Sequence, residues 1–149
     1  MNTSRILAIA TVAGLLSLAG CTSPSMPSAQ SPASLYDRLG GKPAITAVVD
    51  DFIANVAADS KINGRFANAN IAHLKQKLVE QICAGSGGPC VYSGKDMASA
   101  HHGMNIRDDE FNALVGDLVK SLDKFKVPER EKGELLALLG PAKPQIVGQ

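Results

Sequence analysis

The sequence predicts an all-α domain that starts near residue 35, and two observations predict this fold class. In four segments, apolar residues recur every three or four positions, which is the spacing of an amphipathic helix. No stretch of four to eight residues alternates apolar and polar side chains as a half-buried strand would. The chain of 149 residues is long enough for one such domain with a single core.

Residues 1–20 have the composition of a signal peptide, which is not part of the fold. Arg5 precedes a mainly apolar run over residues 6–19, which is shorter than the ~20 residues of a membrane-spanning helix. The run ends in Leu18-Ala19-Gly20-Cys21, which resembles the bacterial lipobox, where cleavage leaves a lipidated cysteine at the new N-terminus. We therefore expect an exported chain with a lipid anchor on Cys21 at the bacterial cell envelope, facing the periplasm if the cell is Gram-negative.

Residues 21–34 are expected to form a flexible tether, and residues 35–149 the folded domain. The tether holds three prolines, five serines and no charged residue. The formal net charge of the whole chain is +1, and no cluster of basic residues stands out. The sequence therefore argues against nucleic acid as a partner.

The first two predicted helices follow from the apolar spacing. The first begins near Pro43, because a helix N-terminus tolerates a missing backbone N–H. Its buried face is expected to contain Ile45, Val48, Val49, Phe52 and Val56. The second helix carries an apolar face of Ile71, Leu74, Leu78 and Ile82, and a glycine-rich break over residues 85–89 ends it.

The third helix has the longest apolar stripe, with acidic residues at its start that favour the positive end of the helix dipole. The stripe is Phe111, Leu114, Val115, Leu118, Val119, Leu122 and Phe125, and the acidic residues are Asp108, Asp109 and Glu110. Pro128 opens a fourth helix, which Gly140-Pro141 should end. Its apolar residues are Leu135, Leu136, Leu138 and Leu139.

Residues 84–96 lack a helical pattern, so the predicted domain encloses a gap that a planar cofactor would fill. Short motifs occur in order around this gap: Leu35-Tyr36-Asp37-Arg38-Leu39-Gly40-Gly41, Val48-Val49-Asp50-Asp51-Phe52, Gly87-Gly88-Pro89, Tyr92-Ser93-Gly94, Met97-Ala98-Ser99-Ala100-His101, Ile106, Phe111 and Val127-Pro128. With this ordered set, residues 34–148 resemble the group I truncated haemoglobins. The resemblance implies a two-over-two helical sandwich that encloses haem b, iron protoporphyrin IX.

The resemblance assigns His101 as the proximal ligand of the haem iron, with Met97 one helical turn before it. Neutral imidazole is a suitable axial ligand, and its second ring nitrogen needs a hydrogen-bond partner that the sequence does not identify. His102 points about 100° away on a helix, so the two histidines cannot both face one iron. His102 is expected to face solvent, and it is the alternative ligand if the register differs.

The resemblance also implies which residues contact haem. Phe66 falls where the family places a phenylalanine against the haem face, and further apolar contacts are expected from Phe52, Met97, Ile106 and Phe111. On the distal side, Ile53 stands where many relatives have a tyrosine that hydrogen-bonds bound oxygen. Leu74 and Leu78 stand at positions that are frequently polar in relatives.

Lys77 admits two interpretations. Some family members use the residue at this position as a second axial ligand, which would require the haem pocket to lower the pKa of the lysine, because only the uncharged amine binds iron. The alternative, which we favour, is a lysine that reaches a haem propionate or water. His73, one turn earlier, is expected to be exposed.

Cys83 and Cys90 flank the glycine-rich loop. In an exported protein this pair is expected to form a disulfide once Cys21 is lipidated. The competing interpretation is a metal site built from Cys83, Cys90, His101 and His102, whose spacing matches no common zinc pattern.

The function expected from the resemblance is reversible binding of a diatomic gas, O2, CO or NO, at the cell envelope. The alternative is a haem enzyme, either an NO dioxygenase or a peroxidase-like protein. Such an enzyme would need a separate reductase, because the sequence has no flavin or nicotinamide fingerprint. The apolar distal residues offer no evident acid–base group for peroxide cleavage, which favours binding over catalysis. The third hypothesis is a structural module that binds no haem.

Overall fold

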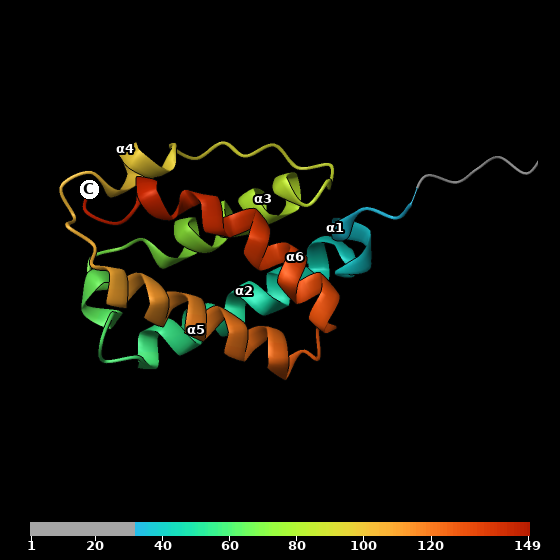
Figure 1. Cartoon of the computed structure of the whole chain (residues 1–149), viewed down its shortest axis with the longest axis horizontal. Coiled ribbons are helices and arrows are strands. Elements are labelled where there is room, and N and C mark those ends of the chain that lie inside the picture. The colour runs from blue at the N-terminus through green and yellow to red at the C-terminus, as the bar shows by residue number, and fades with distance from the viewer. Residues whose placement is uncertain (1–31) are drawn as a thin grey trace, which may run out of the picture. The chain divides into compact units, whose positions relative to one another are not determined.

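Six α-helices and two short 3-10 helices make up residues 32–149, the part of the chain that the computed structural model describes (Figure 1). The predicted signal peptide, Cys21 and the tether up to residue 31 lie outside the described residues. In chain order the elements are α1 (Leu35–Arg38), α2 (Gly41–Ala58), η1 (Asn63–Phe66), α3 (Ile71–Gly85), α4 (Met97–His101), α5 (Asp108–Lys124), α6 (Glu129–Leu139) and η2 (Gly140–Gln145).

The four long helices follow one another along the chain as α2 and α3 and then α5 and α6. The central element is α2, because it packs against both α3 and α5 (Figure 1). The core between them is apolar and contains the whole face predicted for α2. Its buried members are Ile45, Val48, Val49, Phe52, Ile53, Val56, Ile62, Val79, Ile82, Cys83, Leu118, Leu122 and Leu135. No helix within residues 32–149 is long and apolar enough to cross a membrane.

The start of the domain is fixed by a cap and a glycine turn. Ser34, the last residue of the predicted tether, caps α1: its hydroxyl accepts the backbone N–H of Asp37, whose carboxylate in turn accepts the N–H of Ser34. Gly40 and Gly41 then adopt φ values of 91° and 73°, which lie in the left-handed region that favours glycine. The chain therefore turns sharply into α2, and Pro43 lies in the first turn of that helix, as predicted.

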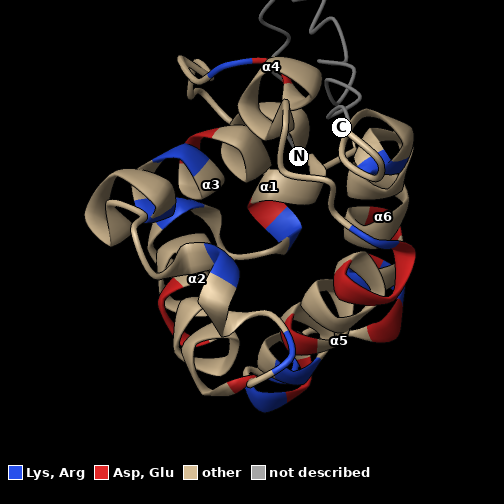
Figure 2. Ribbon diagram, turned by 90° about the vertical axis from the view of Figure 1, so that its left-hand side faces the viewer, with Lys and Arg blue, Asp and Glu red and all other residues tan. Residues whose placement is uncertain are grey.

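Ion pairs attach α6 to its neighbours. Arg38 of α1 donates to the carboxylates of Glu131 and Glu134, and Lys132 reaches Asp123 of α5 at 2.5 Å. Figure 2 shows that basic and acidic residues are interspersed along α5 and α6. These pairs join α6 to α1 and α5, while Leu135 packs in the core.

Two predicted helix ends differ from the structure. The stripe of α5 stops before Phe125, which is 44% exposed, because α5 ends at Lys124 and Lys126 turns the chain with a φ of 55°. Gly140-Pro141 ends the α-helix but not the helical path, which continues as η2. Pro141 is compatible with the first turn of a new helix, since its missing N–H has no partner to lose there.

Candidate cofactor pocket

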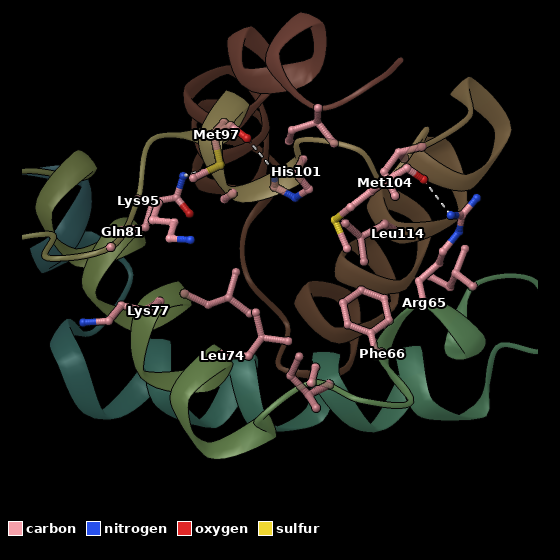
Figure 3. Close-up of a pocket in the computed structure, with 18 of the residues that line it drawn as sticks. Arg65, Phe66, Leu74, Lys77, Gln81, Lys95, Met97, His101, Met104 and Leu114 are labelled. Carbon is pink, nitrogen blue, oxygen red and sulfur yellow. Dashed lines mark hydrogen bonds between the residues drawn. The ribbon is translucent and has the colours of Figure 1, made fainter. Parts of the chain in front are cut away.

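A cavity of about 530 Å³ opens between the α2–α3 pair and the segment formed by α4 and the start of α5 (Figure 3). Its volume lies within the roughly 300–1,000 Å³ that is typical of small-molecule and cofactor sites. The structure brings together ten residues that the sequence singled out, from five helices and the segment before α5. They are Phe52, Ile53, Phe66, Leu74, Lys77, Leu78, Met97, His101, Ile106 and Phe111.

The cavity also contains residues that the sequence reasoning did not select. Leu114 could have been found, because it belongs to the apolar stripe predicted for α5. Arg65, Gln81, Met104 and Ile146 gave no periodic signal. The complete additional set is Ile62, Arg65, Ala69, Asn70, His73, Gln81, Tyr92, Gly94, Lys95, Ala100, Met104, Glu110, Leu114 and Ile146.

His101 is the last residue of α4, and its imidazole is half-buried at the cavity (Figure 3). Its Nδ1 lies 2.8 Å from the backbone carbonyl oxygen of Met97. A carbonyl oxygen only accepts, so in the neutral ring Nδ1 carries the proton and donates it. The lone pair of Nε2 is then free for a metal ion, and the bond to Met97 fixes the plane of the ring.

The other two histidines are exposed, as predicted. His102 follows the last turn of α4 with a ψ of 128°, so it has left the helical path, and it does not line the cavity. His73 is exposed at the start of α3, where its backbone N–H is capped by the Asn70 side chain at 3.0 Å, and its side chain lies on the rim of the cavity. His101 is therefore the only one of the three histidines that is both half-buried and part of the cavity wall.

The wall opposite His101 is apolar. Ile53 of α2 is buried, and Leu74 and Leu78 of α3 pack against the core at its edge. Figure 3 places Leu74 across the cavity from His101. None of these three side chains can donate a hydrogen bond.

Lys77 lies at one end of the cavity, where two other residues of the chain bind its ammonium group. Its Nζ lies 2.9 Å from Glu80 Oε2 and 2.5 Å from Ser93 Oγ. Figure 3 shows the ammonium group pointing away from His101. The hydrogen bond from Lys77, together with those from Gln76 and Ser93, lowers the pKa of Glu80 to about 2. The lysine is therefore held by a carboxylate that stays ionised.

Tyr92 and Gln81 place polar atoms at the rim between α3 and α4. The Tyr92 hydroxyl donates to the backbone carbonyl of Lys95 at 2.7 Å, and burial raises the pKa of this phenol. Gln81 Nε2 lies 3.9 Å from the sulfur of Met97. The first contact closes a turn within the segment before α4, and the second joins α3 to the first residue of α4.

A disulfide joins Cys83 and Cys90, with a Cα–Cα distance of 5.7 Å. Cys83 is fully buried on α3, so the bridge anchors the start of the loop that leads to α4. Within the described residues, no group of three or more histidine, cysteine or acidic side chains is arranged to hold a metal ion. The two cysteines are therefore bonded to each other and do not form the alternative metal site.

These features define a class of protein. A helical domain with a large apolar cavity and a single oriented imidazole is suited to a planar cofactor that carries its own metal and takes one axial ligand from the protein. The cavity residues fit haem in this respect, because they supply apolar faces and one free imidazole nitrogen.

Comparison with known proteins identifies the family. A model of the bacterial-like globin family matches residues 34–147, so the chain belongs to that family. Membership of a globin family makes haem the cofactor, as the sequence motifs predicted. A group 1 truncated haemoglobin of Mycolicibacterium paratuberculosis is 38% identical over 115 residues, which cover 77% of this chain and 85% of the relative.

Solved structures confirm the two-over-two fold. The truncated haemoglobin of Tetrahymena pyriformis in its Fe(III) form is 28% identical and matches with a TM-score of 0.75, over 78% of this chain and all of that chain. The 2/2 haemoglobin of Synechococcus, solved in the cyanomet state with covalently attached haem, is 29% identical with a TM-score of 0.70. That match covers 76% of this chain and 95% of the Synechococcus chain.

Proposed function

We propose that this chain is a gas-binding globin in which His101 ligates the haem iron and a diatomic ligand binds on the opposite side. The observation that carries the proposal is the hydrogen bond between His101 Nδ1 and the Met97 carbonyl. It fixes the tautomer that leaves Nε2 free at the cavity. When bound, haem would supply an iron centre that can take O2, CO or NO.

The distal residues of the chain affect how long such a ligand stays. Ile53, Leu74 and Leu78 shield the site from water with apolar surface, but they provide no hydrogen bond to a polar bound gas. A neutral hydrogen bond contributes roughly 0.5–1.5 kcal/mol, so its absence corresponds to a roughly two- to tenfold lower affinity for the bound gas. We therefore infer a pocket that favours CO over O2 more than a pocket with a distal tyrosine does.

An absorption spectrum of the purified protein tests this function. We expect a haem spectrum in the ferric and ferrous forms, and a shift of the main band when CO is added to the ferrous form. Photolysis of the CO complex should be followed by rebinding of CO. A purified protein reconstituted with haem that shows no CO-dependent change would contradict the proposal.

Lys77 is proposed to leave the distal position open. Its ammonium group is bound to Glu80 and Ser93, and breaking an ion pair while also deprotonating the amine opposes ligation of iron. We expect Lys77→Ala to leave the ferric spectrum high-spin and unchanged near neutral pH. A wild-type spectrum that is low-spin, and that Lys77→Ala converts to high-spin, would instead assign Lys77 as the second axial ligand.

We further propose that the protein is exported and anchored through Cys21, on the basis of the Leu18-Ala19-Gly20-Cys21 motif. Mass spectrometry of the mature N-terminus is expected to find Cys21 as the first residue with a lipid adduct. Cys21→Ala should block this processing and retain residues 1–20. An unmodified Cys21 in a soluble wild-type product would contradict the anchor.

A further inference from the structure

Arg65 joins three separate parts of the cavity wall through one guanidinium group. From η1 it donates to both carboxylate oxygens of Glu110, with Nε at 3.0 Å and Nη2 at 2.9 Å, and Nη1 donates to the backbone carbonyl of Met104 at 2.7 Å. Figure 3 shows Arg65 at the opposite end of the cavity from Lys77, with its bond to Met104 marked. The chain separations are 45 residues to Glu110 and 39 to Met104.

The segment that carries His101 needs such an external contact. Helix α4 has only five residues, and an isolated helix of this length is unstable because its nucleation cost is not repaid by enough hydrogen bonds. The chain then leaves the helical path, with Asn105 in a left-handed conformation at a φ of 47°. The Met104 carbonyl that Arg65 binds lies three residues after His101.

Arg65 and Glu110 form an ion pair in which the carboxylate is buried. Glu110 is 5% exposed, and its carboxylate accepts the backbone N–H of Arg107 at 2.8 Å in addition to the two bonds from Arg65. The Arg107 N–H and the Arg65 guanidinium together lower the pKa of Glu110, so it stays ionised. A bidentate arginine–carboxylate pair of this kind is strong and geometrically specific. Without Arg65, the buried carboxylate would keep only the backbone N–H of Arg107 and the longer contact of the Arg107 guanidinium at 3.6 Å.

We propose that Arg65 is a positioning residue that clamps the segment 102–107 to η1 and α5, and through it sets the orientation of His101 and slows the escape of haem. The proposal rests on the function proposed above, in which His101 ligates the iron. The same guanidinium holds η1, whose last residue, Phe66, lines the cavity. The Arg65 side chain therefore connects the part of the cavity wall that carries His101 to the part that carries Phe66.

The first test uses haem-free protein, so that it is independent of haem binding. We expect Arg65→Met to accelerate amide hydrogen exchange of residues 102–107 at least tenfold, which corresponds to a loss of ~1.4 kcal/mol of local stability. Lys61→Met is the matched control, because Lys61 pairs at 3.2 Å with Asp109 in the first turn of α5, next to Glu110, but both groups are half-exposed and Lys61 does not line the cavity. The control should leave these amides unchanged.

The second test uses the haem-loaded protein. We expect Arg65→Met to release haem to an excess of haem-scavenging apoglobin at least tenfold faster than the wild type. It should also broaden or shift the iron–histidine stretching band of the ferrous protein in resonance Raman spectra. A loss of packing alone would change the release rate without moving this band.

If Arg65→Met does not fold, Arg65→Lys is the variant to measure instead. Lysine retains the charge but lacks the fork that reaches Glu110 and Met104 together, so an intermediate acceleration of exchange and haem release is expected. Exchange and haem release within twofold of the wild type in the folded variant would overturn the clamp. If the wild type binds no haem, the proposed function fails, and the exchange measurement still tests the clamp.

Discussion

Replacing His101 with alanine is expected to lower the haem content of the purified protein at least tenfold. The chain offers one half-buried imidazole at the cavity, and its Nδ1 is already committed to the Met97 carbonyl. The bond between iron and Nε2 would be the single axial link from the protein, and tenfold weaker binding corresponds to only ~1.4 kcal/mol. Haem content is measured from the ratio of haem to protein absorbance after desalting.

His102→Ala is the matched control for this experiment. His102 is adjacent in sequence and exposed, so its removal should leave haem content and spectrum at the wild-type level. In His101→Gly, added imidazole is expected to restore a histidine-like spectrum, because the small ligand can occupy the space left by the side chain. Normal loading and an unchanged spectrum in His101→Ala would remove His101 from the proximal position.

The helical fold was predictable because apolar spacing carries the information directly. The face of α2 from Ile45 to Val56 is buried as the spacing predicted. The ends of helices were less predictable, since they depend on local backbone conformation. Lys126 turns the chain with a positive φ although it is not a glycine. A lysine side chain does not indicate such a turn in the sequence.

The site was predictable where the resemblance named residue types, and not where backbone atoms or distant charges take part. The hydrogen-bond partner of His101 is a backbone carbonyl, which every residue possesses, so the identity of Met97 could not reveal it. Arg65 and Glu110 are each ordinary charged residues in the sequence. Only the folded chain brings them together across 45 positions, and no short-range pattern encodes that distance.

Lys77 illustrates the same limit. The sequence offered iron, a propionate or water as its partner, and the structure adds Glu80 and Ser93. Glu80 is three residues further along the same helix, which is a spacing at which opposite charges meet. Ser93 comes from the loop after the disulfide, and its contribution required knowledge of how that loop folds back onto α3.

The disulfide between Cys83 and Cys90 supports this loop, and its reduction is expected to destabilise the domain. The bridge closes a loop of about eight residues, for which the chain-entropy model gives roughly 2.5 kcal/mol. The native loop requires tight turns: Gly87 has a φ of 86°, and a Cβ at Gly88 would lie 2.8 Å from the Cys83 carbonyl oxygen. In the unfolded chain without the bridge, this loop gains freedom that the native state must then restrict.

We therefore expect a reductant to lower the free energy of unfolding of the wild type by roughly 2.5 kcal/mol, measured by urea denaturation at fixed haem occupancy. The double variant Cys83→Ala/Cys90→Ala should begin at lower stability and show no response to the reductant. An equal response in the double variant would mean that the reductant acts elsewhere. Because the loop leads into α4, the reduced wild type should also release haem faster, whereas unchanged release would confine the role of the bridge to global stability.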